Sequence, residues 1–135
     1  MDLPVDSKAV SPLDAAFAGN RLLASLPPAD RALLEPYLEL VVLEVGSNVL
    51  RAGQNASASY FPFDGLIISL QVEMSGGRSV EVASIGMEGA FGGIVSCGSA
   101  PAFANAMVQL GGPAAALPMG ILEELKGQSS VLKNL

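Results

Sequence analysis

The segment from Leu66 to Ile85 restricts the fold of this chain more than any other part of the sequence. Its first half, LIISLQVEM, places apolar residues at every second position, and Ile67 is the one apolar residue out of step. Side chains of a β-strand alternate between two faces, so this pattern predicts a strand with one buried face. We expect that face to carry Leu66, Ile68, Leu70, Val72 and Met74. The tripeptide SGG then precedes RSVEVASI, which predicts a β-hairpin.

Residues 40 to 118 contain further strand candidates. Among them are ELVVLEV, which begins at Glu39, and NAMVQL, which begins at Asn105, and glycine or proline separates the candidates at short intervals. Many short strands with regular turn signals favour an antiparallel barrel or a double-sheet jelly roll. The sequence therefore predicts a mainly β domain.

Residues 1 to 39 have the pattern of helices. Ser11 can cap a first helix, and Pro12 suits its first turn. Pro28 suits the start of a second helix, and Pro36 predicts a 3₁₀ turn at its end, because proline cannot continue an α-helix.

The last segment, GILEELKGQSSVLKNL, predicts one helix over residues 119 to 135, with Gly127 as a weak point inside it. Its apolar residues recur three, four or seven positions apart, as the seam of a helix pair requires. The residues expected in that seam are Leu122, Leu125, Leu132 and Leu135. We interpret the segment as the start of a dimerisation helix that the sequence truncates. The alternative, an ordinary amphipathic helix packed on the barrel, stays open.

Composition narrows the setting. The chain has 135 residues, enough for one domain with its own core, and 7 basic against 13 acidic residues give a net charge of −6. Such a charge does not attract nucleic acid. The first ten residues lack the features of a signal peptide, and no apolar run reaches the ~18 residues that span a bilayer. We therefore expect a cytoplasmic protein without membrane contact.

Helices, then a jelly roll, then an apolar helix is the order of elements in one known family. From about Asn20 to the end, the sequence resembles the N-terminal sensory domain of Crp/Fnr transcription regulators, which has the cyclic-nucleotide-binding-like fold. The segments that carry the resemblance are RLLASLPPADRALLEPYLELVVLEVGSNVLRAGQ, YFPFDGLIISLQVEMSGGRSVEVASIGMEGAFGG and NAMVQL. The glycines at the turns of that fold correspond to Gly46, Gly53, Gly65 and Gly77.

The resemblance implies a domain plan and a function. Residues 1–19 are an N-terminal extension with a short helix, residues 20–118 the barrel with its leading helices, and residues 119–135 the start of the dimerisation helix. The expected function is that of a sensory and dimerisation domain in a homodimer, in which DNA is bound only through a further domain not in this chain. A stand-alone domain that binds a small ligand or a partner is the alternative.

In cyclic-nucleotide binders of this fold, a Glu after a Phe-Gly pair contacts the ribose, and an Arg about a dozen residues later pairs with the phosphate. Here Phe91-Gly92 is followed by Gly93, and the Arg position falls at Ala104 or Asn105. No Arg, Lys or His occurs from Gly89 to Leu110. The loop is therefore expected to be degenerate and not to bind cyclic AMP. Its candidate ligand contacts are Phe91, Gly92, Gly93, Asn105 and Met107. Asn105 shares a strand face with Gln109, and both could instead face water.

Other chemistry is poorly supported. The chain contains no histidine, which removes haem-histidine sensors and most zinc or iron sites. Its single cysteine, Cys97, cannot hold an iron–sulfur cluster alone and most simply packs in a loop. The carboxylates of the strand region are scattered, with no geometry for paired acid–base work: Asp64, Glu73, Glu81 and Glu88. We expect no enzyme activity, no metal and no cofactor, and the effector is not identified by the sequence.

Overall fold

The computed structural model describes residues 12–51, 57–92 and 105–133. The helices before the strands are α1 (Pro12–Gly19), α2 (Arg21–Ala24), α3 (Pro28–Leu34) and the 3₁₀ helix Glu35–Tyr37. The strands are β1 (Glu39–Leu43), β2 (Asn48–Leu50), β3 (Ala58–Pro62), β4 (Ile67–Glu73), β5 (Ser79–Ile85), β6 (Asn105–Leu110) and β7 (Gly112–Pro118). Two helices follow them, α4 (Met119–Lys126) and α5 (Ser130–Lys133).

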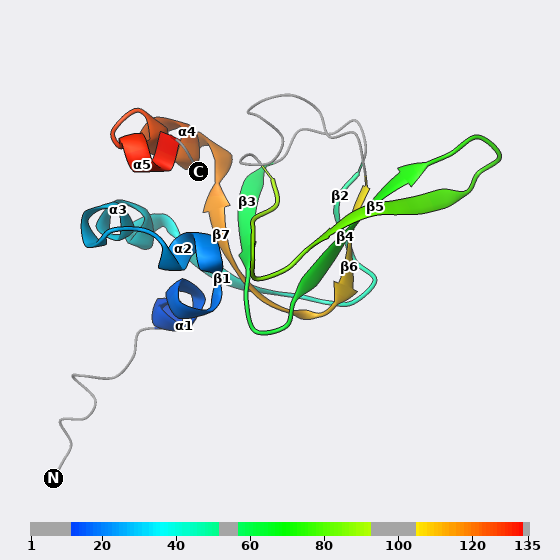
Figure 1. Cartoon of the computed structure of the whole chain (residues 1–135), viewed down its shortest axis with the longest axis horizontal. Helices are drawn as coiled ribbons and strands as arrows, with labels where there is room; N and C mark the ends of the chain where they lie inside the picture. Colours follow the sequence, from blue (N-terminus) through cyan, green and yellow to red (C-terminus); the bar gives the residue numbers. More distant parts are fainter. Residues whose placement is uncertain (1–11, 52–56, 93–104, 134–135) are drawn as a thin grey trace, which may run out of the picture.

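The described strands form two antiparallel sheets (Figure 1). One sheet has the order β1-β7-β3 and the other the order β2-β6-β4-β5. The mainly β, double-sheet architecture expected from the sequence is confirmed.

Two apolar clusters fill the spaces between these layers. The interior cluster lies between the two sheets, since both contribute to it, and its buried members are Leu50, Leu66, Ile68, Phe91, Ala106, Val108 and Ala114. The helix-side cluster joins the other face of the three-stranded sheet to the helices, through residues such as Phe17, Leu23, Leu34, Phe61, Leu117 and Leu122. The helices therefore cover one sheet only, and Figure 1 shows them all on that side of the molecule.

The predicted buried face of β4 is correct at its start and wrong at its end. Leu66 and Ile68 are 1% and 0% exposed, whereas Leu70 and Val72 are only half-buried and Met74 is 48% exposed. The pairing register with β5 shifts directly after Leu70. Beyond that point the β4–β5 hairpin extends away from the body of the domain (Figure 1). The alternation persists there, but no second layer covers the apolar side chains.

The predicted N-terminal helices are present. α1 begins at Pro12 and α3 at Pro28, and Pro36 lies in the 3₁₀ helix that ends the segment. Ser11, the expected cap of α1, lies outside the described residues.

The continuous helix expected over residues 119 to 135 is two helices, with a turn after Lys126. Leu122, Leu125 and Leu132 are 0%, 4% and 0% exposed, and all three belong to the helix-side cluster of this same chain. The seam is therefore not open over the described residues, because the outer face of the three-stranded sheet and its helices already cover it. Leu135 lies outside the described residues.

The turn between α4 and α5 is fixed by Ser129. Its hydroxyl donates to the Asp30 carboxylate on α3 and accepts a hydrogen bond of 3.2 Å from the N–H of Leu132. Ser129 therefore caps α5 and ties it to α3.

None of the helices in the described part of the chain is long and apolar enough to cross a bilayer.

Candidate functional site

Phe91, the first residue of the expected phosphate loop, pairs with β3. The N–H of Tyr60 donates to the Phe91 carbonyl over 2.7 Å, and the N–H of Phe91 donates to the Tyr60 carbonyl over 2.9 Å. Its side chain is buried in the interior cluster. The backbone groups of Phe91 are thus committed to the strand, and the residue serves the core.

Packing against β3 requires a glycine at position 92. Its φ is +122°, and a Cβ there would clash with the carbonyl oxygen of Ala58 and lie 2.9 Å from the Cα of Ser59. Only glycine fits so close to β3 in this conformation. The fold therefore accounts for a glycine at position 92, one of the candidate ligand contacts. Gly93, the position of the missing Glu, and Ala104, one of the two candidate positions of the missing Arg, lie outside the described residues. Asn105, the other candidate, is the first residue of β6.

Asn20 anchors the segment that leads into this loop, and the sequence analysis did not single it out. It is 0% exposed. Its side-chain nitrogen donates to the carbonyl oxygens of Pro62 and Gly89, each over 2.8 Å, and its oxygen accepts from the N–H groups of Leu22 and Leu23. The N–H groups belong to the first turn of α2, for which asparagine is a preferred cap. The cap could have been found from sequence, but not the contacts to Pro62 and Gly89.

Asn105 and Met107 do not face the space between the sheets. On β6, Val108 pairs with Ile68, and both lie in the interior cluster. Met107 pairs with Ser69 and Asn105 with Gln71, so these residues occupy the alternate, outer row of the same sheet. A ligand held between the sheets would not meet these side chains, and Gln109 is exposed. The alternative that Asn105 and Gln109 face water agrees with the exposure of Gln109, whereas Asn105 is half-buried.

The two arginines closest to the loop along the sequence are Arg51 and Arg78. Arg51 follows β2 and Arg78 precedes β5, and both side chains are exposed, as expected. Arg31 instead joins helices: it pairs with Glu35 over 3.1 Å and with Asp14, and its guanidinium carbon lies 4.1 Å from the centre of the Phe17 ring. The hydrogen bonds to Glu35 and Asp14 raise the pKa of Arg31 above its ordinary value.

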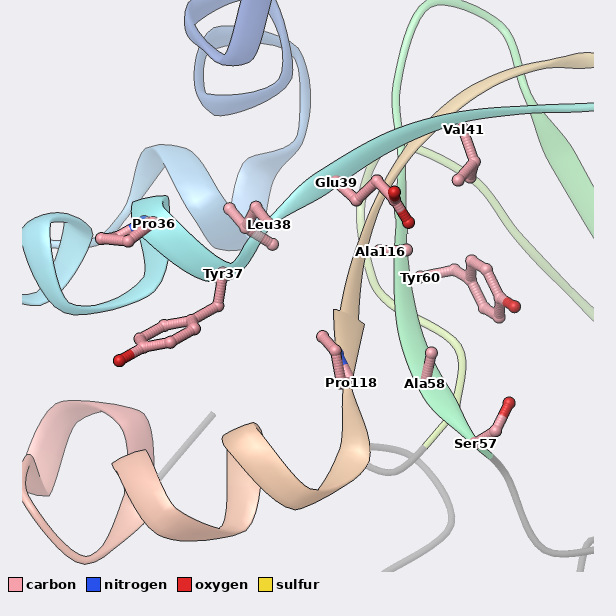
Figure 2. A pocket seen from close by; sticks show the side chains of 10 residues that line it. All are labelled: Pro36, Tyr37, Leu38, Glu39, Val41, Ser57, Ala58, Tyr60, Ala116 and Pro118. Carbon is pink, nitrogen blue, oxygen red and sulfur yellow. The ribbon is translucent and has the colours of Figure 1, made fainter.

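A groove of about 560 Å³ lies on the interior side of the three-stranded sheet, close to the start of α4 (Figure 2). Its lining residues are Pro36, Tyr37, Leu38, Glu39, Val41, Ser57, Ala58, Tyr60, Ala116 and Pro118. The N–H of Met119 donates to the Ser57 carbonyl over 3.1 Å and so joins the first turn of α4 to the start of β3. Among the described residues of this lining, Glu39 is the one ionic side chain, and none of them offers a phosphate a cation.

No family model matches the sequence, and no curated protein matches it. Solved structures do. The N-terminal domain of a transcriptional regulator from Streptomyces coelicolor A3(2) matches with a TM-score of 0.69 at 20% identity, over 88% of this chain and 82% of that one. The catabolite activator protein of Thermus thermophilus matches with a TM-score of 0.70 at 19% identity, over 84% of this chain and 53% of that one. The chain has the cyclic-nucleotide-binding-like fold.

A third solved structure with this fold belongs to a cAMP-independent kinase. The regulatory subunit of a cAMP-independent protein kinase A from Trypanosoma cruzi, bound to guanosine, matches with a TM-score of 0.72 at 15% identity. The match covers 87% of this chain and 41% of that one. The chain thus spans about half or less of the activator protein and the kinase subunit, so their remaining parts have no counterpart in it.

The cyclic-nucleotide-binding-like fold is therefore present, and a converging set of charged contacts is not visible in residues 12–51, 57–92 and 105–133. Within those same ranges no three His, Cys, Asp or Glu side chains gather as a metal site would need. Glu88, one of the scattered carboxylates, accepts from the N–H of Gly86 in its own turn. Cys97 lies outside the described residues.

Proposed function

We propose that this chain is the sensory domain of a Crp/Fnr-like transcription regulator and that it does not respond to cyclic nucleotides. The observation that carries the regulator assignment is the match over 88% of this chain to the N-terminal domain of a transcriptional regulator. A domain with a net charge of −6 is poorly suited to contact DNA itself, so DNA binding would fall to another domain.

The contacts and the composition of the loop region support the loss of cyclic-nucleotide binding. The Phe91 backbone is engaged with Tyr60, and Gly92 is needed for the approach to β3. The sequence from Gly89 to Leu110 supplies no cation. Each charge-assisted bond that a buried phosphate lacks removes roughly 1.5–3 kcal/mol of binding free energy. The domain would then take an uncharged effector, or none. The kinase subunit bound to guanosine is a precedent for an uncharged nucleoside on this fold.

A homodimer remains part of the proposal, but its interface must differ from the seam expected from the sequence. The side chains of Leu122, Leu125 and Leu132 are buried in the helix-side cluster of the same chain. On α5, Val131 is 39% exposed and is the apolar side chain that a partner helix could reach.

The alternative, a stand-alone binding domain, is favoured by that same burial, because the terminal helices need no partner to cover their leucines. Reading the gene beyond codon 135 separates the two functions. A regulator continues into a basic helix-turn-helix segment, and the full gene product shifts its own promoter DNA in a gel assay while residues 1–135 alone do not. A gene that ends near codon 135, or a product without DNA affinity, would contradict the regulator assignment. The cytoplasmic location stays a prediction.

A further inference from the structure

We infer that the groove between Tyr37 and Tyr60 is a binding site for an organic cation, such as a methylated ammonium group, held over Ala116 between the Glu39 carboxylate and the Tyr60 ring. This inference goes beyond the proposed function, because it concerns a different ligand chemistry and needs none of the residues of the degenerate phosphate loop.

Within this groove, the gap above Ala116 between Glu39 and Tyr60 is called the notch. It follows from the strand register. Glu39 pairs with Ala116, and Ala116 pairs with Tyr60, so the three residues form one row across the sheet. Adjacent strands lie about 4.7–4.9 Å apart, which places the outer two residues of the row ~9–10 Å apart. The small Ala116 between two long side chains leaves a gap of one strand width. The next row pairs Ala58 with Pro118 and continues the shallow floor.

The lining suits a positive charge. A cation over the face of a tyrosine ring is attracted by the ring quadrupole, and a carboxylate on the opposite side adds Coulomb attraction. Glu39 supplies that carboxylate, and the described residues of the lining include no Lys or Arg. In Figure 2 the Glu39 carboxylate lies between the two tyrosines, above the floor formed by Ala58, Ala116 and Pro118. The net charge of −6 also raises the local concentration of cations and opposes anions.

The surrounding residues favour a cation with an apolar shell over a metal ion. Pro36, Leu38, Val41 and Pro118 contribute hydrocarbon surface, whereas Glu39 contributes the one carboxylate of the lining. Hard metal ions take six or more oxygen ligands, but a methylated ammonium group gains from contact with aromatic and aliphatic surface. The alternative to a ligand-binding role is that Tyr60, which is half-buried, only packs against the end of the interior cluster.

The chain provides its own reporter for this site. It contains two tyrosines and no tryptophan, and Tyr37 and Tyr60 both line the groove. Intrinsic fluorescence of the protein therefore comes from this groove. A Tyr37→Phe variant leaves Tyr60 as the sole emitter, and Tyr37, at 47% exposed, tolerates the change without loss of core packing.

The test is a fluorescence titration of the Tyr37→Phe protein with choline at constant ionic strength, beside its neutral isostere 3,3-dimethylbutan-1-ol. We expect saturable binding of choline, about three- to fivefold weaker after Glu39→Gln, since an exposed ion pair contributes at most ~1 kcal/mol. The matched control is Glu44→Gln, an exposed glutamate outside the groove, which should leave the titration unchanged.

Three results would overturn the inference: no saturable change with choline, equal binding of the isostere, or equal weakening by Glu39→Gln and Glu44→Gln. Ala116→Val, which fills the notch and keeps both the carboxylate and the ring, should also abolish binding. Its thermal unfolding is measured in parallel, and a folded Ala116→Val protein that still binds choline would contradict the placement. Failure of any of these leaves the regulator assignment untouched, because that assignment rests on the fold.

Discussion

The side-chain nitrogen of Asn20 donates to the carbonyl oxygen of Gly89 over 2.8 Å, across 69 positions of sequence. The same nitrogen donates to Pro62, and the N–H of Arg21 donates to the Met87 carbonyl over 2.7 Å. The first turn of α2 is therefore bonded directly to the segment that enters the Phe91-Gly92 loop. Asn20 therefore links the start of α2 to two segments that are distant in sequence, at Pro62 and at Gly89.

Replacing Asn20 by Ala should lower the free energy of unfolding by about 2–4 kcal/mol, because the helix loses its cap and two carbonyl groups lose their donor. Chemical denaturation measures the change. Asn48→Ala is the control, since Asn48 is exposed on β2 and its loss should cost less than about 1 kcal/mol. Equal effects of the two substitutions would show that the Asn20 network carries no stability.

Gly92→Ala should destabilise the domain, because a Cβ at that position meets the backbone of Ala58 and Ser59 and because φ is +122°. Gly120→Ala provides the contrast. Gly120 lies in α4 with open space around its Cα, so alanine there should stabilise the protein by about 0.5–1 kcal/mol. A stable Gly92→Ala protein would mean that the approach to β3 is looser than described.

Ile68→Asp should destabilise the domain strongly, by about 3 kcal/mol or more, since it places an unpaired charge where the side chain is 0% exposed. Val82→Asp in the projecting hairpin, where the side chain is 58% exposed, should change the melting temperature little. Equal melting temperatures of the two variants would show that the start of β4 is no more covered than the projecting end of the hairpin.

Residues that contact each other locally were predictable from the sequence, and residues brought together by the fold were not. The alternation in LIISLQ identified β4, and Gly46, Gly65 and Gly77 have the positive φ angles expected of turns. Strand β7, GPAAALP, was missed because alanine and proline have low strand propensity. Its conformation comes from pairing with β1 and β3 on its two sides.

The site shows the same division. The groove combines residues 39, 60 and 116, which no local pattern connects, and only the register places them in one row. The prediction of an open seam of leucines on α4 and α5 was wrong for a different reason. Spacing of three, four and seven is the same whether a helix packs on its own domain or on a partner, so the sequence could not choose between the two.

The dimer prediction now needs a different test. Leu125→Glu or Leu132→Glu would disrupt the core of the chain itself, so neither variant can report on association. Val131→Glu, on the exposed face of α5, should raise the dissociation constant of the dimer, measured by sedimentation at several concentrations. The same change should alter the free energy of unfolding by no more than about 0.5 kcal/mol. A protein that stays monomeric at every concentration, or a dimer indifferent to Val131→Glu, would contradict an interface at this helix.

Calorimetric titration with cyclic AMP tests our proposal that this cyclic-nucleotide-binding-like domain does not bind cyclic nucleotides. We expect no saturable heat and, in parallel, no rise in melting temperature at a nucleotide concentration of roughly 1 mM, where a micromolar ligand would stabilise the fold by about 4 kcal/mol. A micromolar dissociation constant would show that the proposal is wrong. If Arg51→Ala or Arg78→Ala then abolished that binding, the arginine directly after β2 or the one in the β4–β5 hairpin would have replaced the missing phosphate contact.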